Sequence, residues 1–371
     1  MAEATAPRLS WPTIGIVLQD FALGGTERIA VRLATQWAAE GADVTIFCGS
    51  SAGEMRSLLG ATVAVVEAMP RIERAPGSRR TLGQAAARHF ATTPVQIMFL
   101  PGNFHWPAAP PIAAMPRGCR PAIVAQVSAA LSKPQRSPLR KIAFDLRMRW
   151  LLRGAHAVVT LSDAATRQAE HIVGGDRART IPLPALPDDP SPPLPIDQGS
   201  RVVLAAGRLV PEKGFDLLIE AIAGVADAAL VVFGEGPDRQ RLEQLAERYR
   251  VADRVSLPGY VADTRGWLDR ARLFVLSSRF EGFPAVLVEA LAAGRPLVAT
   301  ACTPATSLID DPAVGLVVPI DDAVALRQAI GTMLTTPPPD PACLAAKVAH
   351  HRIGAVAREY LALFARLAAE R

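Results

Sequence analysis

The sequence predicts an α/β protein made of two doubly wound, Rossmann-like domains with parallel sheets that face each other across a cleft. Two observations predict this class. Short apolar runs of strand length alternate with helical segments along most of the 371 residues. A proline-rich stretch at residues 181–200 interrupts this alternation near the middle and prevents both helix and strand. A chain of this length can form two domains of ordinary size.

The apolar runs of the first half are continuous, which is typical of strands buried on both faces of a parallel sheet. A Gly24-Gly25 turn follows the first run and starts a helix over residues 26–41. The predicted strands are residues 14–18, 44–47, 63–66, 97–100, 122–125 and 157–160.

The alternation restarts after the proline-rich stretch. Strands are predicted at residues 202–206, 229–233, 255–257, 273–276 and 296–299, and helices at 215–225, 237–249 and 323–334. We therefore expect a first domain at residues 1–185 and a second at 199–350. A terminal helix at 351–371 is expected to pack back on the first domain.

Composition excludes several classes of protein. The net charge of +5 is too weak to indicate nucleic acid, but it suits an anionic small molecule or an anionic membrane surface. The four cysteines, Cys48, Cys119, Cys302 and Cys343, have no paired spacing and indicate reduced thiols, with no disulfide or metal site. The sequence has no apolar run of signal-peptide or membrane-span length. We expect a cytoplasmic protein, either free or peripheral on the cytoplasmic face of the membrane.

The most informative stretch for function is residues 277–294, where a strand leads through a Gly-Phe-Pro turn into a helix. Such a turn is a common place to hold a phosphate. Glu281 lies in the turn and Glu289 eight positions later, so the two carboxylates return to nearly the same side of a helix. Carboxylates accept hydrogen bonds well from sugar and ribose hydroxyls.

A second motif supplies positive charge. Gly207 follows a predicted strand and permits close approach, and Arg208 and Lys213 stand five residues apart across the next turn. A guanidinium fork and a lysine point charge suit a diphosphate. The alternative is a pair of solvated surface cations.

Two more glycine turns follow predicted strands. Gly234 begins one of them, on the same sheet edge as Gly207. Gly24 and Gly25 form the corresponding turn of the first domain, where backbone N–H groups would meet a phosphate. A tight turn with Thr26 as helix N-cap explains that segment equally well.

Taken together, these motifs resemble the retaining glycosyltransferases of family GT4, which have the GT-B fold. The resemblance is specific from about residue 202 to 322 and in the first domain depends mainly on residues 24–28. The motifs that carry it are Gly207-Arg208…Lys213-Gly214, Gly234-Glu235-Gly236-Pro237, Gly259, Glu281-Gly282-Phe283-Pro284…Glu289-Ala290 and Gly315 to Pro319 followed by Asp321.

The resemblance implies a role for each motif residue. Arg208 and Lys213 would hold the diphosphate and stabilise the leaving group, which makes a divalent metal unnecessary. Glu289 would bind the ribose, and Glu281 the donor sugar. The remaining expected donor contacts are Gly24, Gly25, Gly207 and Gly234 near the phosphates or the sugar, the amides of Gly282 and Phe283 at the sugar, Val286 and Leu287 through the backbone near the phosphates or ribose, and Tyr260 and Val261 facing the base.

The resemblance also implies the reaction. The enzyme would be a retaining hexosyltransferase that takes a sugar from a UDP-, GDP- or ADP-sugar, without a cofactor. The acceptor would be a glycan or a lipid-linked molecule of polysaccharide or glycolipid biosynthesis. Attack from the front face, assisted by the leaving phosphate, would need no enzymic nucleophile.

Two positions depart from the family pattern. Family members often carry a histidine after the strand corresponding to residues 122–125, where this chain has Ser128 followed by Ala129 and Ala130. Either Ser128 stands there or another residue, such as His105, takes the role. The loop after residues 296–299 has Thr303 in a run without the acid that the family often has. These departures mark either an unusual substrate or lost activity.

Two alternatives to this function therefore stay open. One is a non-catalytic nucleotide-sugar-binding scaffold at a membrane assembly. The other is a nucleotide-sugar epimerase or hydrolase, although a histidine-poor first domain disfavours such acid–base chemistry.

The role of the basic segment 133–153 is also open. With its interleaved apolar residues, it is either a membrane-surface helix or an ordinary helix with a charged outer face.

Overall fold

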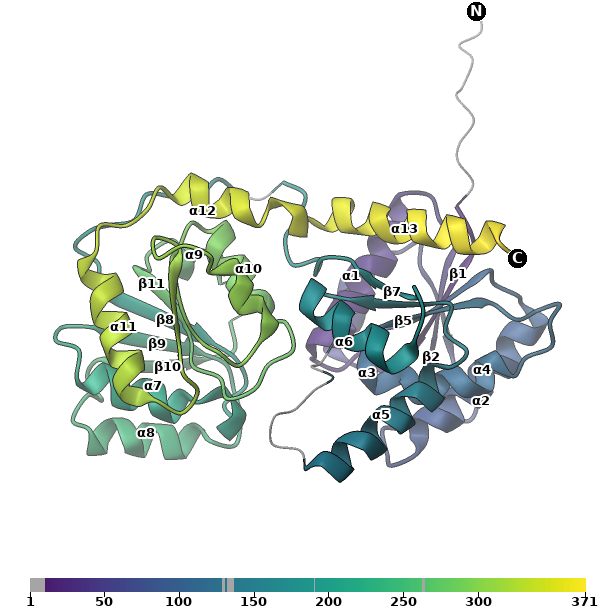
Figure 1. Cartoon of the computed structure of the whole chain (residues 1–371), viewed down its shortest axis with the longest axis horizontal. Helices are drawn as coiled ribbons and strands as arrows, with labels where there is room; N and C mark the ends of the chain where they lie inside the picture. The colour runs from purple at the N-terminus through teal and green to yellow at the C-terminus, as the bar shows by residue number, and fades with distance from the viewer. Residues whose placement is uncertain (1–10, 129–130, 132–136, 190, 262–263) are drawn as a thin grey trace, which may run out of the picture. The chain divides into compact units, whose positions relative to one another are not determined.

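The computed structural model describes residues 11–128, 131, 137–189, 191–261 and 264–371. The chain divides into two compact units, unit 1 with residues 1–184 and 352–371 and unit 2 with residues 185–351 (Figure 1). Each unit is an α/β structure with one parallel sheet.

Unit 1 contains a seven-stranded parallel sheet in the order β3-β2-β1-β4-β5-β6-β7. Its short edge strand β7 has no apolar run and was not predicted, whereas the other six strands lie within one or two residues of the predicted bounds. The strands are β1 (Ile14–Leu18), β2 (Val44–Cys48), β3 (Ala64–Glu67), β4 (Ile97–Leu100), β5 (Ala122–Gln126), β6 (Ala157–Thr160) and β7 (Ala178–Thr180).

Helices cover both faces of this sheet, because alternate residues of each buried strand point to opposite sides. Ile97 and Phe99 of β4 pack into a core with helices α1 and α13, while Met98 and Leu100 pack into a second core with α2, α4, α5 and α6. The helices are α1 (Gly25–Ala39), α2 (Ser78–Thr92), α3 (Gly102–His105), α4 (Ala109–Ala113), α5 (Pro138–Leu152), α6 (Asp163–Val173) and α13 (Ile353–Ala369).

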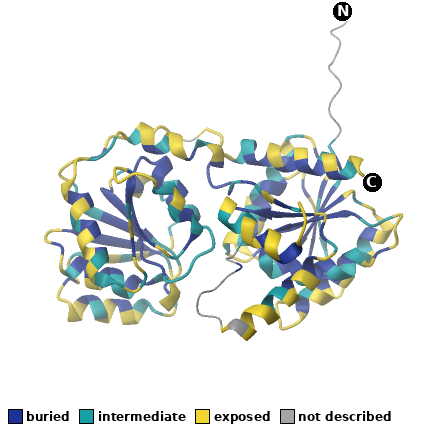
Figure 2. Ribbon diagram, viewed as in Figure 1, coloured by how far each residue is buried: buried dark blue, intermediate teal, exposed yellow. Residues whose placement is uncertain are grey.

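Unit 2 contains a six-stranded parallel sheet in the order β10-β9-β8-β11-β12-β13. The strands are β8 (Val202–Ala206), β9 (Ala229–Phe233), β10 (Val255–Gly259), β11 (Leu273–Leu276), β12 (Leu297–Thr300) and β13 (Gly315–Val318). The helices are α7 (Phe215–Ala223), α8 (Arg239–Arg248), α9 (Arg265–Leu268), α10 (Ala285–Ala292), α11 (Ala323–Thr335) and α12 (Pro341–Lys347). Figure 2 shows the buried strands and the exposed outer faces of the helices.

The proline-rich stretch after residue 184 packs on unit 2. The Arg265 guanidinium donates to the carbonyls of Ser191 (2.9 Å) and Pro192 (2.7 Å). The fully buried Arg295 donates to the carbonyl of Leu194 at 2.7 Å. These arginines thus satisfy backbone carbonyls that lie outside the strands of the sheet.

Both sheets have a switch point, where the strand order reverses direction. It lies between β1 and β4 in unit 1 and between β8 and β11 in unit 2. In open parallel sheets, ligands bind outside the carboxyl ends of the strands at this point. No helix of the described part of the chain is both long and apolar enough to cross a bilayer.

Candidate functional site

The two charged motifs of unit 2 meet at its switch point. The loop with Arg208 and Lys213 follows β8, and the loop with Glu281 follows β11, the neighbouring strand. The chain therefore brings together, at one sheet edge, side chains that lie 68 residues apart in the sequence.

An ion pair joins these loops. The Lys213 ammonium donates to Oε1 of Glu281, and the Ser278 hydroxyl donates to the same oxygen at 3.1 Å. The side chains of Lys213 and Glu281 are 21% and 15% exposed, so the pair is partly shielded from water yet reachable. One carboxylate oxygen thus accepts two hydrogen bonds, while the lysine keeps two further donors.

Glycines allow the lysine to reach this position. A Cβ at Gly207 would lie 3.0 Å from Cε of Lys213, so the lysine stem crosses directly over this residue. Gly214 has a φ of +63°, and a Cβ there would lie 2.1 Å from the carbonyl oxygen of Ser277. The Ser277 hydroxyl donates to the Lys213 carbonyl at 2.9 Å, which fixes the two loops together.

Arg208 has an environment different from that of Lys213. Its side chain is exposed, and it has no hydrogen-bond or ion-pair partner within the described residues. The adjacent backbone is fixed, because Leu209 donates to the carbonyl of Glu235 at 2.9 Å. The loop therefore presents an unpaired guanidinium from a fixed backbone, as an anion site requires.

Arg279 holds the two loops in place, and the sequence reasoning missed it. Its guanidinium bonds both oxygens of Asp216, at 2.9 and 3.1 Å, and Oδ1 of Asp321 at 2.6 Å. The backbone amide of Arg279 donates to the carbonyl of Glu212 at 2.8 Å. Although burial opposes it, the hydrogen bonds from Arg279 hold the pKa of Asp216 below its usual range. The Ser-Arg pair before the predicted turn was visible in the sequence, but its two distant acids were not.

Thr303 stands where the family often has an acid. Its hydroxyl donates to the carbonyl of Gly282 at 2.6 Å, so it fixes the glycine turn. The neighbouring thiol of Cys302 has a pKa raised by burial to about 11. It is therefore protonated near neutral pH and unsuited to act as a nucleophile.

The remaining residues of the β11–α10 segment lie beside this turn. The Phe283 ring lies 5.7 Å from the ring of the buried His351. Val286 and Glu289 are half-buried on α10, and Leu287 is fully buried. The Leu287 amide donates to the carbonyl of Pro284 at 3.2 Å, so it is already engaged within the turn.

The β9 and β10 loops complete this edge of unit 2. Gly234 donates to the carbonyl of Gly259 at 2.8 Å. Tyr260, 52% exposed, and the half-buried Val261 follow Gly259 at the end of β10. Both belong to the loop after β10, which the resemblance implies would face the base.

The Gly24-Gly25 turn of unit 1 differs from the prediction of a Thr26 cap. Gly24 is the N-cap of α1 and makes no side-chain cap bond. The carboxylate of Glu27 covers it, because a Cβ at Gly24 would lie 2.3 Å from Oε2, and Arg74 binds the same carboxylate at 2.9 Å. A Cβ at Gly25 would meet nothing within 4 Å, so only this second glycine is open to a ligand.

His105 and Ser128 have different environments. His105 is fully buried, its Nε2 accepts from the Gln19 amide at 3.1 Å, and its Nδ1 donates to the Pro101 carbonyl at 2.6 Å. Burial lowers its pKa to about 4. Both ring nitrogens of His105 are thus engaged by backbone groups, which disfavours it as the replacement for the family's histidine. Half-buried Ser128 lies at the end of β5, where its hydroxyl meets that of Thr26 at 3.4 Å. The next two residues, Ala129 and Ala130, lie outside the described part.

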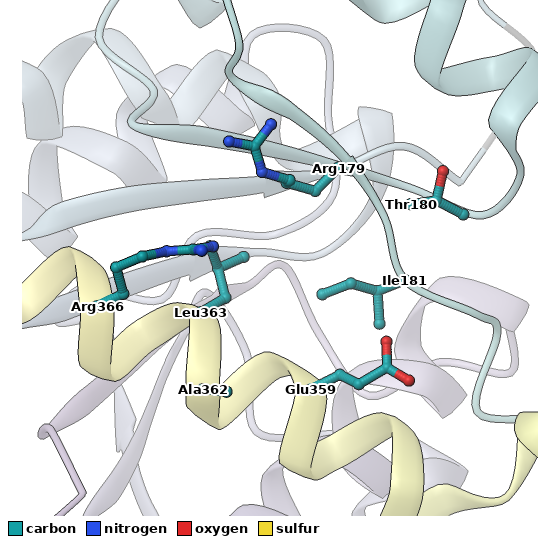
Figure 3. A pocket seen from close by; sticks show the side chains of 7 residues that line it. All are labelled: Arg179, Thr180, Ile181, Glu359, Ala362, Leu363 and Arg366. Carbon is teal, nitrogen blue, oxygen red and sulfur yellow. The ribbon is translucent and has the colours of Figure 1, made fainter.

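A cavity of unit 1 lies at the edge of its sheet that β7 forms. Figure 3 shows its walls, formed by strand β7 with the residue after it and by helix α13. Its lining residues are Arg179, Thr180, Ile181, Glu359, Ala362, Leu363 and Arg366, and none of them is a predicted site residue.

Comparisons with known proteins agree with the motifs. The family model for the glycosyl transferase 4-like domain matches residues 24–185, and that for glycosyl transferases group 1 matches residues 200–336. The lipopolysaccharide core biosynthesis glycosyltransferase LpsE of Rhizobium meliloti is 38% identical over 129 residues, 35% of this chain and 38% of that protein. LpsD of the same organism is 32% identical over 171 residues, 46% of this chain and 48% of that protein. The chain thus spans less than half the length of these relatives.

Solved structures share the fold over nearly the whole chain. Sucrose-phosphate synthase from Thermosynechococcus elongatus has a TM-score of 0.77 at 19% identity and covers 97% of this chain and 100% of its own. WaaG, a glycosyltransferase involved in lipopolysaccharide biosynthesis, has a TM-score of 0.73 at 18% identity, covering 95% and 99%. The two parallel-sheet units are thus those of the GT-B fold, as predicted. With two family models that together match most of its length, this chain belongs to the GT4-type glycosyltransferases.

Proposed function

We propose that this protein is a retaining, metal-independent glycosyltransferase that moves a hexose from a nucleoside-diphosphate sugar to a glycan or lipid-linked acceptor. The observation that carries the proposal is the ion pair of Lys213 and Glu281 at the switch point of unit 2, in loops that also carry Arg208, whose exposed side chain has no partner among the described residues. Cations for a diphosphate and a carboxylate for a sugar thus lie on one sheet edge.

The charges suit the departure of a nucleoside diphosphate. Negative charge builds on the diphosphate as the glycosidic bond breaks, and fixed cations stabilise it without a metal ion. Lys213 keeps two N–H donors beyond its bond to Glu281, and Arg208 offers a bidentate fork. Glu281 then receives the sugar hydroxyls and Glu289 the ribose, while Tyr260 and Val261 face the base.

Retention of the anomeric configuration needs no nucleophile from the protein. The thiol of Cys302 next to the turn is protonated, and Lys213 and Ser278 both bond to Oε1 of Glu281. These observations favour front-face attack, in which the leaving phosphate accepts the proton of the acceptor hydroxyl.

Relatives and neighbours suggest which substrates to test first. Several similar proteins are named for polysaccharides, among them the colanic acid biosynthesis glycosyltransferase WcaL of Escherichia coli, 31% identical over 168 residues. HepE of Anabaena was solved with UDP and UDP-glucose. A UDP-sugar is therefore the first donor to try, with GDP- and ADP-sugars beside it, and the cytoplasm is the compartment that supplies them.

The first test is thermal-shift screening against the three classes of nucleotide sugar, followed by release of nucleoside diphosphate with glycan and lipid-linked acceptors. We expect kcat/KM to fall about 100-fold or more in Lys213→Ala and Arg208→Ala. Arg248→Ala, at the end of α8, is the matched control and should keep full turnover. Full turnover in both site variants would refute the proposal.

Two further measurements test the retention of configuration and the independence of metal ions. NMR of the product's anomeric proton should show retention, and turnover should persist in excess EDTA. Inverted product or loss of turnover in EDTA would contradict the corresponding part of the proposal.

One observation keeps a second candidate, the non-catalytic nucleotide-sugar-binding scaffold. The histidine of the family pattern is absent after β5, and His105 is fully buried with both ring nitrogens bonded to backbone groups. Binding of a nucleotide sugar without release of nucleoside diphosphate across the whole acceptor panel would favour that candidate.

A further inference from the structure

Helix α5 of unit 1 has two apolar faces on opposite sides. Its inner face, with Met148, Leu151 and Leu152, is buried in the core beneath the sheet. Its outer face carries Leu139, Ile142, Leu146 and Trp150, which are 80%, 57%, 62% and 45% exposed. At 100° per residue these four side chains form one stripe opposite the buried face.

The exposed apolar side chains of this outer stripe lie next to one another and are not scattered singly over the surface. Single exposed apolar residues are ordinary, whereas four in line along a 15-residue helix, about 22 Å long, form a continuous patch. Figure 2 shows the helix with both exposed and buried residues along its length. An apolar face of this kind is typical of a surface that meets an apolar partner.

Cations flank the stripe on both sides. Arg140 and Arg147 lie on one side of it, Arg149 lies on the other, and Arg153 follows the stripe at the C-cap of the helix, all exposed. The Arg149 Nε donates to the carbonyl of Ile172 at 3.0 Å. The only acid of the helix is Asp145. The Arg153 guanidinium lies 5.8 Å from the centre of the Trp150 ring, which places a cation beside the aromatic end of the stripe.

We propose that this face of α5 docks the protein on an anionic lipid bilayer. The apolar side chains would enter the boundary between headgroups and acyl chains, where Trp150 has its preferred environment. The arginines would bind lipid phosphates while their stems lie along the apolar stripe.

The charge pattern favours a bilayer over a second copy of the chain. A symmetric dimer through α5 would place the same arginines of the two copies against each other. Like charges facing each other oppose association, whereas anionic headgroups attract the same residues. Docking is independent of donor binding, since none of these residues belongs to the site of unit 2.

The test is co-sedimentation of the full chain with vesicles of phosphatidylcholine, with and without phosphatidylglycerol. We expect binding to the anionic vesicles, weaker binding to the neutral ones, and loss of binding at high salt. The double variant Ile142→Ser/Leu146→Ser should lower the partition coefficient about tenfold or more. Leu58→Ser/Val324→Ser, at positions 60% and 54% exposed elsewhere on the chain, should bind as the wild type does.

The contribution of the arginines and the insertion of Trp150 into the bilayer are tested separately. Arg140→Glu/Arg147→Glu should lower binding to anionic vesicles about tenfold or more, and the matched Arg80→Glu/Arg88→Glu on α2 should change it far less. Brominated lipids should quench the fluorescence of the wild type, and Trp150→Phe should lose that quenched component. Circular dichroism and donor thermal shifts confirm that each variant is folded.

Three results would overturn the proposal. One is a wild-type protein that does not co-sediment with anionic vesicles. Another is a stripe variant that binds them as the wild type does. The last is a wild-type dimer that Ile142→Ser/Leu146→Ser makes monomeric without any vesicle binding, because a second copy would then cover the stripe.

Discussion

At the residue scale, His105 is fixed in its neutral form between two backbone groups. Nδ1 donates to Pro101 and Nε2 accepts from Gln19, so one tautomer satisfies both bonds. Gln19 in turn accepts from the Ser78 hydroxyl at 3.0 Å. The imidazole therefore connects the ends of β1 and β4, the strands that flank the switch point of unit 1.

This arrangement predicts a pH dependence of stability. The folded pKa of about 4 lies below the ordinary 6.5, so between these values the unfolded chain binds a proton that the folded chain does not. The free energy of unfolding should therefore fall as the pH falls from 6.5 to 4, by on the order of 3 kcal/mol at most.

Urea unfolding followed by tryptophan fluorescence at stepped pH measures this slope. His105→Gln should be less stable at neutral pH and should lose much of the slope. His171→Gln, exposed on α6, should keep the wild-type curve. An unchanged slope in His105→Gln would show that another group titrates.

At the element scale, the loops after β8 and β9 cross in close contact. Gly234 has a φ of +135°, and a Cβ there would lie 1.9 Å from the carbonyl oxygen of Gly207. Gly234→Ala should therefore cost several kcal/mol of stability and weaken donor binding, since the backbone before Arg208 must move.

Gly331→Ala is the matched control for this substitution. Gly331 lies within α11, and a Cβ there would meet nothing within 4 Å. Alanine should add up to about 1 kcal/mol of stability at this helix position. Melting curves with and without donor measure both variants, and equal melting temperatures would contradict the crossing seen in the structure.

Elements with a long apolar run could be predicted from the sequence, and those without one could not. Residues 14–18 and 202–206 are buried strands because every side chain is apolar, as predicted. Strand β7 contains Arg179 and lies at the sheet edge, where one side needs no apolar cover. Its existence depends on pairing with β6, which no local pattern reveals.

The same distinction holds for the site. The glycine and charge motifs predicted that Lys213 and Glu281 each follow a strand, and the resemblance placed them in one donor site. The strand order β8-β11 that brings them together was not predicted. The clamp from Arg279 to Asp216 and Asp321 depends on how three loops fold together. The burial of His105 likewise depends on residues that are far away in the sequence.

At the scale of the whole molecule, the chain leaves unit 1, forms unit 2 and returns. Helix α13 lies in the core of unit 1, where Trp37 donates to the carbonyl of Ala357 at 3.2 Å and its ring lies 5.1 Å from that of Phe364. The Tyr360 hydroxyl accepts from the buried Gln126 amide at 2.9 Å. The last helix is thus part of a core built on the first strands.

Phe364→Ala should therefore destabilise unit 1 by about 3–5 kcal/mol, because it leaves a cavity between α1 and α13. Hydrogen exchange measured peptide by peptide should rise in β1 and α1. Leu344→Ala, at a buried position of α12 in unit 2, should raise exchange in unit 2 instead. Faster exchange of unit 2 in Phe364→Ala would contradict separate cores.

The return of α13 has a consequence for synthesis on the ribosome. Residues 185–351 of unit 2 form one uninterrupted segment that is synthesised before helix α13 of unit 1. The strands of unit 1 are made before unit 2, but Tyr360 and Phe364 of its core are made after it. The core of unit 1 is therefore completed only after unit 2 has been made, and until then the apolar sheet face that α1 and α13 share is only partly covered.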